Sequence, residues 1–311
     1  LRFAIPALCA GNACTVKPAP SVARVSETLF SLVPKGLPLI GAWLSHEDTL
    51  KAIEDTDAMA FTGSTHTGRL LAAHAGRHLK KTVLELGGSN PFIILPDADL
   101  QRAAIDACYS RFRDAGQSCN AAKRIIVTQD IAEQFIPLFL AECAKLQTGN
   151  PKDPNTTLAP LHRQDLRQTV HEQVQDAVAH GAQCLSGGYI PEGESWFYPA
   201  TVLDQVNPNC RVWHEEVFGP VAMILRADNP DHAVALANDT PFGLGACIYT
   251  ADTANAWQYA ERIQAGSVFI NRHTSSDLRL PFGGVKASGY GRELSEFGLY
   301  EFVNVKTYWQ K

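Results

Sequence analysis

Short apolar runs alternate with amphipathic stretches along most of the chain. Apolar positions that recur every three or four residues predict helices, and short continuous apolar runs predict strands. We expect strands or short apolar runs at residues 13–16, 37–42, 58–61, 82–86, 91–95, 124–127, 222–226, 245–249 and 267–270. We expect helices at residues 21–33, 66–79, 99–113, 130–147, 161–180, 231–238 and 251–264. A further helix is expected after Ser45, which stands three residues before an acid and can cap it. This alternation is typical of βαβ units with mostly parallel strands, so the sequence predicts an α/β fold.

The chain of 311 residues is long enough for about two domains at roughly 150 residues each. We expect a partial doubly wound, Rossmann-like cofactor domain at residues 1–87 and a second α/β catalytic domain at residues 88–285. Residues 286–311 form a predicted tail, in which the alternation at 301–305 favours an edge strand that pairs with another subunit. The chain opens inside an apolar segment, which indicates that an amino-terminal part is missing.

Charge and cysteine usage exclude several classes of protein. A formal charge of −5 is the opposite of the basic footprint that nucleic-acid binding needs. No apolar run approaches the ~18 residues of a membrane span, and no signal segment opens the chain, so we expect a cytoplasmic protein without a membrane partner. The eight cysteines include no C-x-x-C pair and no zinc-type spacing, which predicts reduced thiols and no metal.

Two residues stand where an α/β fold usually places chemistry. Cys119 lies in a loop between a predicted helix and a predicted strand, where local donors or a cation could stabilise its thiolate. Taken alone, a cysteine of this kind is more often an ordinary buried thiol. Glu85 ends an apolar strand, where burial of a carboxylate is costly. A general base and a partly exposed strand-end acid explain Glu85 equally well.

Three further patterns are weak by themselves. The Thr-Gly-Ser-Thr turn at 62–65 joins a strand to a helix and could hold a phosphate, but a plain turn explains it nearly as well. Lys17 follows a predicted strand, and this position alone is only weak evidence for a ligand contact. The acidic pair at 215–216 could bind a ribose diol, although a solvated acidic turn is the better interpretation of that pattern alone.

The joint order of these motifs changes their weight. The motifs are Lys-Pro at 17–18, Phe-Thr-Gly-Ser at 61–64, Glu-Leu-Gly-Gly at 85–88, Gly-Gln-Ser-Cys at 116–119, Glu-Glu-Val-Phe-Gly-Pro at 215–220 and Pro-Phe-Gly-Gly at 281–284. In this order and spacing the chain resembles the aldehyde dehydrogenase superfamily over nearly its whole length, and it is most similar to succinate-semialdehyde dehydrogenases.

The resemblance implies that an aldehyde is oxidised to a carboxylic acid with NAD or NADP. Cys119 would attack the aldehyde and carry the thiohemiacetal and then the thioester, and Glu85 would activate the hydrolytic water. The implied cofactor contacts are Lys17, Gly63, Ser64, Leu86, Glu216 and Phe218. Pro20 stands where many NAD-using members have an acid, so NADP is not excluded. The family's oxyanion-binding Asn lies upstream of Leu1, which leaves the Cys119 amide as the remaining donor.

The resemblance also indicates a substrate with a second carboxylate. Arg113, six residues before Cys119, and Arg2 match arginines that bind this group, and Ser276 is a weaker candidate. An arginine suits the role because its guanidinium binds a carboxylate bidentately and stays charged. Succinate semialdehyde is therefore the expected substrate, and other acid semialdehydes would satisfy the same residues.

Three alternatives stay open at this stage. The chain could be a neutral-aldehyde dehydrogenase of the same family, with Arg113 merely on the surface. It could be an inactive truncated chain that binds only nucleotide or partner subunits. A cysteine hydrolase without a cofactor is disfavoured because no motif places a histidine as its base. The family and the tail also suggest a homodimer or homotetramer.

Overall fold

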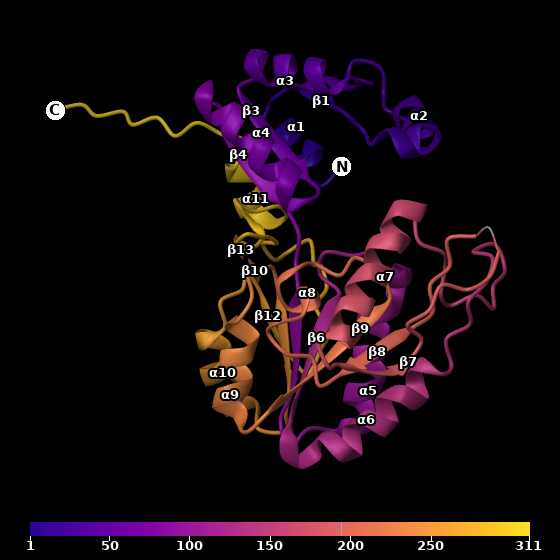
Figure 1. The fold of residues 1–311 in the computed structure, drawn as a ribbon. Helices are drawn as coiled ribbons and strands as arrows, with labels where there is room; N and C mark the ends of the chain where they lie inside the picture. The colour runs from indigo at the N-terminus through magenta and orange to yellow at the C-terminus, as the bar shows by residue number, and fades with distance from the viewer. Residues whose placement is uncertain (194) are drawn as a thin grey trace. The chain divides into compact units, whose positions relative to one another are not determined.

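The computed structural model describes residues 1–193 and 195–311. The chain divides into two units, and each unit has its own β-sheets (Figure 1). The first unit comprises residues 1–86, 276–283 and 289–311. The second comprises residues 87–275 and 284–288. The predicted α/β class is confirmed, since strands and helices alternate in both units.

The first unit holds two small sheets. One pairs β1 with β2 in parallel, and the other has the order β14-β4-β3, with β3 and β4 parallel and β14 antiparallel. The strands are β1 (Cys14–Val16), β2 (Leu39–Gly41), β3 (Ala58–Thr62), β4 (Lys81–Glu85) and β14 (Gly289–Tyr290). The helices are α1 (Ala4–Cys9), the 3-10 turn η1 (Pro20–Val22), α2 (Ala23–Ser31), α3 (His46–Asp55), α4 (Thr65–Arg77) and α11 (Ser295–Tyr300).

Serine side chains start two of these helices. The hydroxyl of Ser45 accepts a hydrogen bond from the Asp48 amide at 3.1 Å, which confirms the predicted cap of α3. Ser64 accepts from the Thr67 amide at 3.2 Å in the same way, so α4 begins directly after the turn that follows β3. The strand-turn-helix order predicted for this segment is confirmed.

The second unit is built on a sheet in the order β12-β11-β5-β6-β9-β8-β7, in which β7 alone runs antiparallel to its neighbour among the described strands. The strands are β5 (Asn90–Ile94), β6 (Ala122–Thr128), β7 (Gln183–Ser186), β8 (Thr201–Asp204), β9 (Val221–Ala227), β11 (Ala246–Tyr249) and β12 (Val268–Ile270). Strands β5 and β6 are buried along their whole length, as expected for a parallel sheet covered on both faces.

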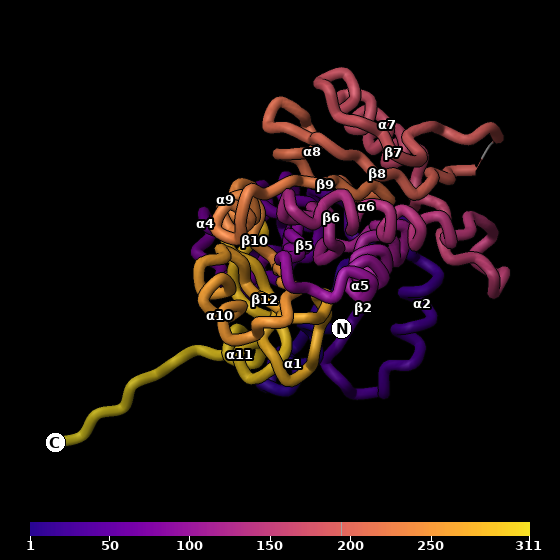
Figure 2. The backbone as a smooth tube through the Cα atoms, turned by 90° about the horizontal axis from the view of Figure 1, so that it is seen from below, coloured from indigo at the N-terminus to yellow at the C-terminus, as the bar shows by residue number. Residues whose placement is uncertain are grey.

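The second unit also contains helices. They are α5 (Leu100–Phe112), η2 (Arg113–Gly116), α6 (Gln129–Cys143), α7 (Gln164–Ala179), α8 (Arg211–His214), α9 (Pro230–Asn238) and α10 (Thr253–Arg262). Figure 2 shows α5 and α6 side by side, and both pack against β6. Helix α9 packs against β5, β6 and β9. A short antiparallel pair, β10 (Phe242–Gly243) with β13 (Val285–Lys286), completes the unit.

Several elements were not predicted, and they are short or lie in polar sequence. They are α1, α8 and α11 and the strands β7, β8, β10, β13 and β14. Residues 303–311 form no helix or strand in this single chain and run out as the extended tail in Figure 1, so its pairing with another subunit stays a prediction. Among the described residues, no helix is long and apolar enough to cross a membrane.

Candidate active site

Cys119 lies in the short loop between η2 and β6, and its side chain is half-buried. The carbonyl of the next residue, Asn120, accepts hydrogen bonds from Thr274 Oγ1 at 2.6 Å and from Asn90 Nδ2 at 3.1 Å. The Ser118 hydroxyl donates to Asn120 Oδ1 at 2.7 Å. Segments far apart in the sequence therefore fix the backbone around the predicted nucleophile.

Lys123 fixes the same loop from inside, and sequence reasoning missed it. Its side chain is fully buried, and Nζ donates to the carbonyls of Ser118 at 2.7 Å and Cys119 at 3.0 Å. Burial lowers the pKa of Lys123 below its usual value, while the charge of Glu216 opposes that shift. A lysine placed within a buried strand is the signal that could have found it, because such a charge needs partners.

Glu216 joins this network from the loop after α8. Its Oε1 lies 3.2 Å from Lys123 Nζ and accepts a hydrogen bond from the Gly88 amide at 3.1 Å. A Cβ atom on Gly88 would collide with the carbonyl oxygen of Cys119. The glycine therefore allows the connection between β4 and β5 to lie directly against the backbone of Cys119.

A second buried cation holds the two loops together. Arg111 is fully buried at the end of α5 and donates to the carbonyls of Gly116, Val217 and Gly219. Burial lowers its pKa to about 9, and the nearby charge of Glu216 opposes the shift. Arg111 thus connects the segment before Cys119 to the loop that carries Glu216 and the half-buried Phe218.

Arg113 starts η2, just before the loop that carries Cys119, and its side chain is exposed. Its Nε is 3.2 Å from Asp114 Oδ2, and its guanidinium lies 5.7 Å from the centre of the Tyr109 ring. It lines a small pocket together with the residues that flank Cys119. The lining is Tyr109, Ser110, Arg113, Ser118, Asn120, His273 and Thr274. Arg113 and the two residues on either side of Cys119 therefore line one pocket within the second unit.

Glu85 ends β4 in the first unit, and its side chain is buried. Its two carboxylate oxygens have no hydrogen-bond partner among the described residues. Burial raises the pKa of Glu85 to about 8, the neighbouring Glu293 raises it as well, and the cations Arg2 and Arg292 oppose the shift. A carboxyl group in this state can give up and take back a proton near neutral pH.

Arg2 and Ser276, two of the predicted carboxylate contacts, touch each other. Arg2 Nη1 donates to Ser276 Oγ at 3.0 Å, and Arg2 Nη2 lies 2.5 Å from Glu293 Oε1. The guanidinium also lies 4.6 Å from the centre of the Phe282 ring. The structure brings this pair together in the first unit, while Arg113, the third predicted contact, belongs to the second unit.

The remaining predicted cofactor contacts lie at strand ends of the first unit. Lys17 follows β1 and is half-buried, with Nζ 3.5 Å from the Pro18 carbonyl. Gly63 and Ser64 are exposed at the amino end of α4. Leu86 is buried after β4, and it lies so close to Gly68 of α4 that a Cβ there would collide with it. An open helix start with a hydroxyl beside it is a chemically suitable place for a pyrophosphate.

Comparisons with known proteins agree with these features. The aldehyde dehydrogenase family matches residues 1–308. The NAD(P)+ succinate semialdehyde dehydrogenase of Escherichia coli K12 is 44% identical over 319 residues, which is 100% of this chain and 68% of that protein. An NADP+ succinate-semialdehyde dehydrogenase of Mycobacterium bovis is also 44% identical, over 99% of this chain and 69% of that protein.

A solved structure shows the same likeness in three dimensions. The succinic semialdehyde dehydrogenase of Streptococcus pyogenes, in complex with NADP+, superimposes with a TM-score of 0.93 at 35% identity. The match covers 97% of this chain and 68% of that one. With the family matched along nearly the whole sequence and the fold shared with a solved member, this chain belongs to the aldehyde dehydrogenase family.

Proposed function

We propose that this chain oxidises succinate semialdehyde to succinate with NAD+ or NADP+. The observation that carries the choice of substrate is Arg113, an exposed cation on the pocket that the flanks of Cys119 also line. Within the first unit, Arg2 contacts Ser276 as well as Glu293, and this pair is a separate observation that supports a substrate with a carboxylate. Relatives at 44% identity that are named for this substrate support the same assignment.

In the proposed reaction Cys119 is the nucleophile. Its thiolate attacks the aldehyde carbon and forms a thiohemiacetal, and its amide donates to the oxygen that becomes negative. Lys123 and Arg111 hold the loop in place during this step, because they donate hydrogen bonds to the backbone carbonyls of Gly116, Ser118 and Cys119. NAD(P)+, when bound, accepts the hydride and leaves a thioester on Cys119.

Glu85 completes the cycle as the general base. Its carboxylate takes a proton from water as the water oxygen bonds to the thioester carbon, and the C–S bond then breaks, which releases the acid and leaves Cys119 as the thiolate. Glu85 passes its proton to solvent before the next cycle. A base with a pKa of about 8 is well matched to this task near neutral pH.

The chain's own residues fit the cofactor. We assign the pyrophosphate to the amino end of α4 with Gly63 and Ser64. Lys17 and Glu216 are each assigned to the ribose because each matches a position of the family's motifs. Leu86 and Phe218 are the apolar contacts in this assignment. Pro20, which starts η1, places no negative charge where a 2′-phosphate would bind, so both cofactors are expected to work. Assembly into a homodimer or homotetramer and location in the cytoplasm stay predictions.

Turnover by the purified chain tests the proposal. Reduced nicotinamide is followed by absorbance with succinate semialdehyde, and with butanal as a neutral aldehyde of the same carbon number, using NAD+ and NADP+ in parallel. Turnover with the acid that exceeds turnover with butanal supports the substrate. Equal or faster use of butanal would assign a neutral-aldehyde dehydrogenase. No turnover by a chain that is folded by circular dichroism would contradict activity of this chain.

A further inference from the structure

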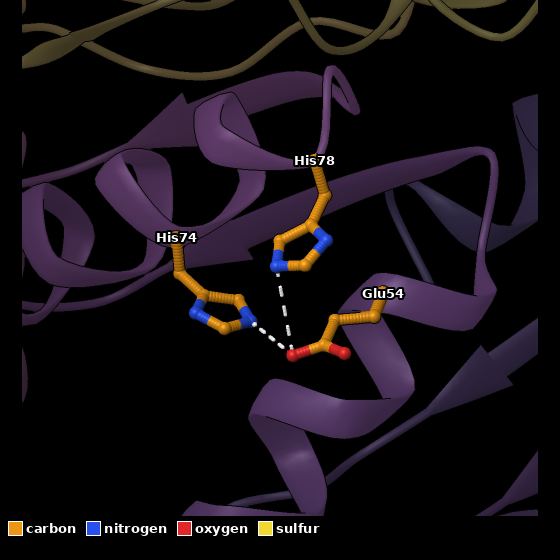
Figure 3. Close-up of side chains that lie close together, drawn as sticks. All are labelled: Glu54, His74 and His78. Atoms are coloured by element: carbon orange, nitrogen blue, oxygen red, sulfur yellow. Dashed lines mark ion pairs between the residues drawn. The ribbon is translucent and has the colours of Figure 1, made fainter.

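A carboxylate and two imidazoles meet between α3 and α4, and none of these three residues is among those assigned to catalysis (Figure 3). Glu54 lies in the last turn of α3, His74 in the last turn of α4, and His78 directly after α4. His74 Nε2 is 3.1 Å from Glu54 Oε1, and His78 Nε2 is 3.6 Å from the same oxygen. Both rings therefore point at one carboxylate oxygen.

The spacing of these atoms suits a metal ion. One possible ligand atom from each residue lies within 4.8 Å of those of the other two. Tetrahedral zinc with bonds of about 2.0–2.1 Å to histidine and carboxylate holds its ligand atoms roughly 3.3 Å apart. The two measured separations, 3.1 and 3.6 Å, bracket that value. Only a small side-chain adjustment would place three ligands around one ion.

The helix provides the arrangement of the two histidines. Residues four apart lie on the same face of a helix, and the rings of His74 and His78 are 5.0 Å apart between centroids. Imidazole with carboxylate is a donor set that zinc accepts. Sequence reasoning missed this cluster because it searched for cysteine-based spacing, and Glu54 is distant from the histidine pair along the chain.

The site is open to solvent on part of its surface. The side chains of Glu54 and His78 are 41% and 39% exposed, and that of His74 is 18% exposed. An ion can enter from water, and water can complete its coordination. His74 Nε2 also lies 3.2 Å from the Leu50 carbonyl oxygen, so a metal at this nitrogen requires the tautomer that carries its proton on Nδ1.

We propose that Glu54, His74 and His78 bind one zinc ion that links the ends of α3 and α4. The alternative is two ion pairs at the surface between the histidines and Glu54, without a metal. Such contacts need neither two imidazoles on the same oxygen nor ligand separations that match a coordination sphere. The convergence of all three groups from two helices favours the metal site.

Zinc binding to the full chain tests this proposal. Exposed thiols also bind zinc, so every sample is first alkylated with iodoacetamide. Zinc is then titrated against a competing fluorescent chelator for the unsubstituted chain, His78→Gln and Glu54→Gln. The matched control is His66→Gln, an exposed histidine on the same helix outside the cluster. Two variants of different chemistry guard against a local folding defect in either one.

The expected result is one zinc per chain in the unsubstituted protein and in His66→Gln. Each cluster variant should bind that ion at least roughly tenfold more weakly, since loss of even a residue that supports a metal ligand costs this much. Zinc should also raise the midpoint of thermal unfolding of the first two proteins but not of the cluster variants. Equal zinc affinity in all four proteins, or no zinc bound by the alkylated unsubstituted chain, would overturn the proposal.

Discussion

The loop of Cys119 and the strand end that carries Glu85 are stabilised in opposite ways. In the second unit, Lys123 donates to two carbonyls of the loop, and Thr274 and Asn90 donate to a third. In the first unit, the buried carboxylate of Glu85 has no hydrogen-bond partner among the described residues. One site is held by many polar contacts, and the other keeps a buried acid without them.

This difference matches the two proposed tasks. A nucleophile gains most from a fixed position, because small displacements of the attacking atom are costly in rate. A general base gains most from a pKa near the working pH, which strong hydrogen bonds to its charged form would lower. Burial and Glu293 raise the pKa of Glu85 to about 8, and among the described residues no hydrogen bond to its carboxylate lowers that value, which suits the proposed role as a base.

Removal of the nucleophile should have the largest effect. We expect Cys119→Ala to reduce formation of reduced nicotinamide by at least roughly 1,000-fold, because the proposed thiohemiacetal and thioester both form on the Cys119 sulfur. The control is Cys184→Ala, an exposed thiol of the same unit in β7. Both variants are assayed at saturating aldehyde. Near-normal turnover by Cys119→Ala would remove this residue from the mechanism.

Substitution of the base should separate the two chemical steps. Glu85→Gln keeps the shape of the side chain but cannot accept a proton, so steady-state turnover should fall about 100-fold or more. The first oxidation does not need this base, so a rapid burst of reduced nicotinamide should remain. Rapid-mixing absorbance measures the burst and the slow phase. Glu296→Gln, an exposed acid at the start of α11, is the control.

The same residue should set the pH dependence of the slow phase. The pKa of Glu85 is about 8, so at lower pH the carboxyl group is mostly protonated and cannot act as a base. Hydrolysis of the thioester should therefore speed up as the pH rises through that value. The burst should not follow this curve. A slow phase that is independent of pH between 6 and 9 (about two units below to one above the pKa) would show that another group activates the water.

Many features of these two regions can be predicted from the sequence. Continuous apolar runs located the buried strands β5, β6 and β9, and a serine before an acidic turn located the start of α3. Glu85 was noticeable because a carboxylate seldom ends an apolar strand. These features depend on neighbours along the chain, which a single sequence displays directly.

The partners of the buried cations could not be predicted in this way. Arg111 reaches carbonyls more than a hundred residues away, at Val217 and Gly219. Lys123 meets Glu216 across a similar separation. Only the folded sheet brings these segments together, because their pairing depends on strand order rather than on local pattern. The sequence could show that a buried charge needs a partner, but not which residue supplies it.

Substitution of the buried Lys123 should make the position of the Cys119 loop less well fixed. Lys123→Met leaves two loop carbonyls without their donor and leaves Glu216 without its cation, so kcat/KM should fall roughly 10- to 100-fold. The KM for NAD(P)+ should rise as well if Glu216 holds the ribose. Lys145→Met, an exposed lysine after α6, is the matched control. Thermal unfolding identifies the temperature at which both variants are folded for the assay.

A kcat/KM for Lys123→Met within twofold of that of Lys145→Met would argue against the buried network as the source of the loop's position. A fall in kcat/KM with an unchanged KM for NAD(P)+ would limit the role of Lys123 to the nucleophile loop. The two readouts therefore distinguish loss of loop geometry from loss of the ribose contact. A general loss of stability would instead appear in the unfolding midpoint.

The smallest effect is expected at Arg113, the exposed residue beside the Cys119 loop. Arg113→Ala should raise KM for succinate semialdehyde about tenfold, a value reduced from that of a buried charged hydrogen bond because the side chain is exposed. KM for butanal should stay unchanged, since that aldehyde has no carboxylate to lose. Arg163→Ala, an exposed arginine paired with Asp165, is the control. An equal rise in both KM values would assign Arg113 to the geometry of the loop, because a charge contact acts on the acid alone.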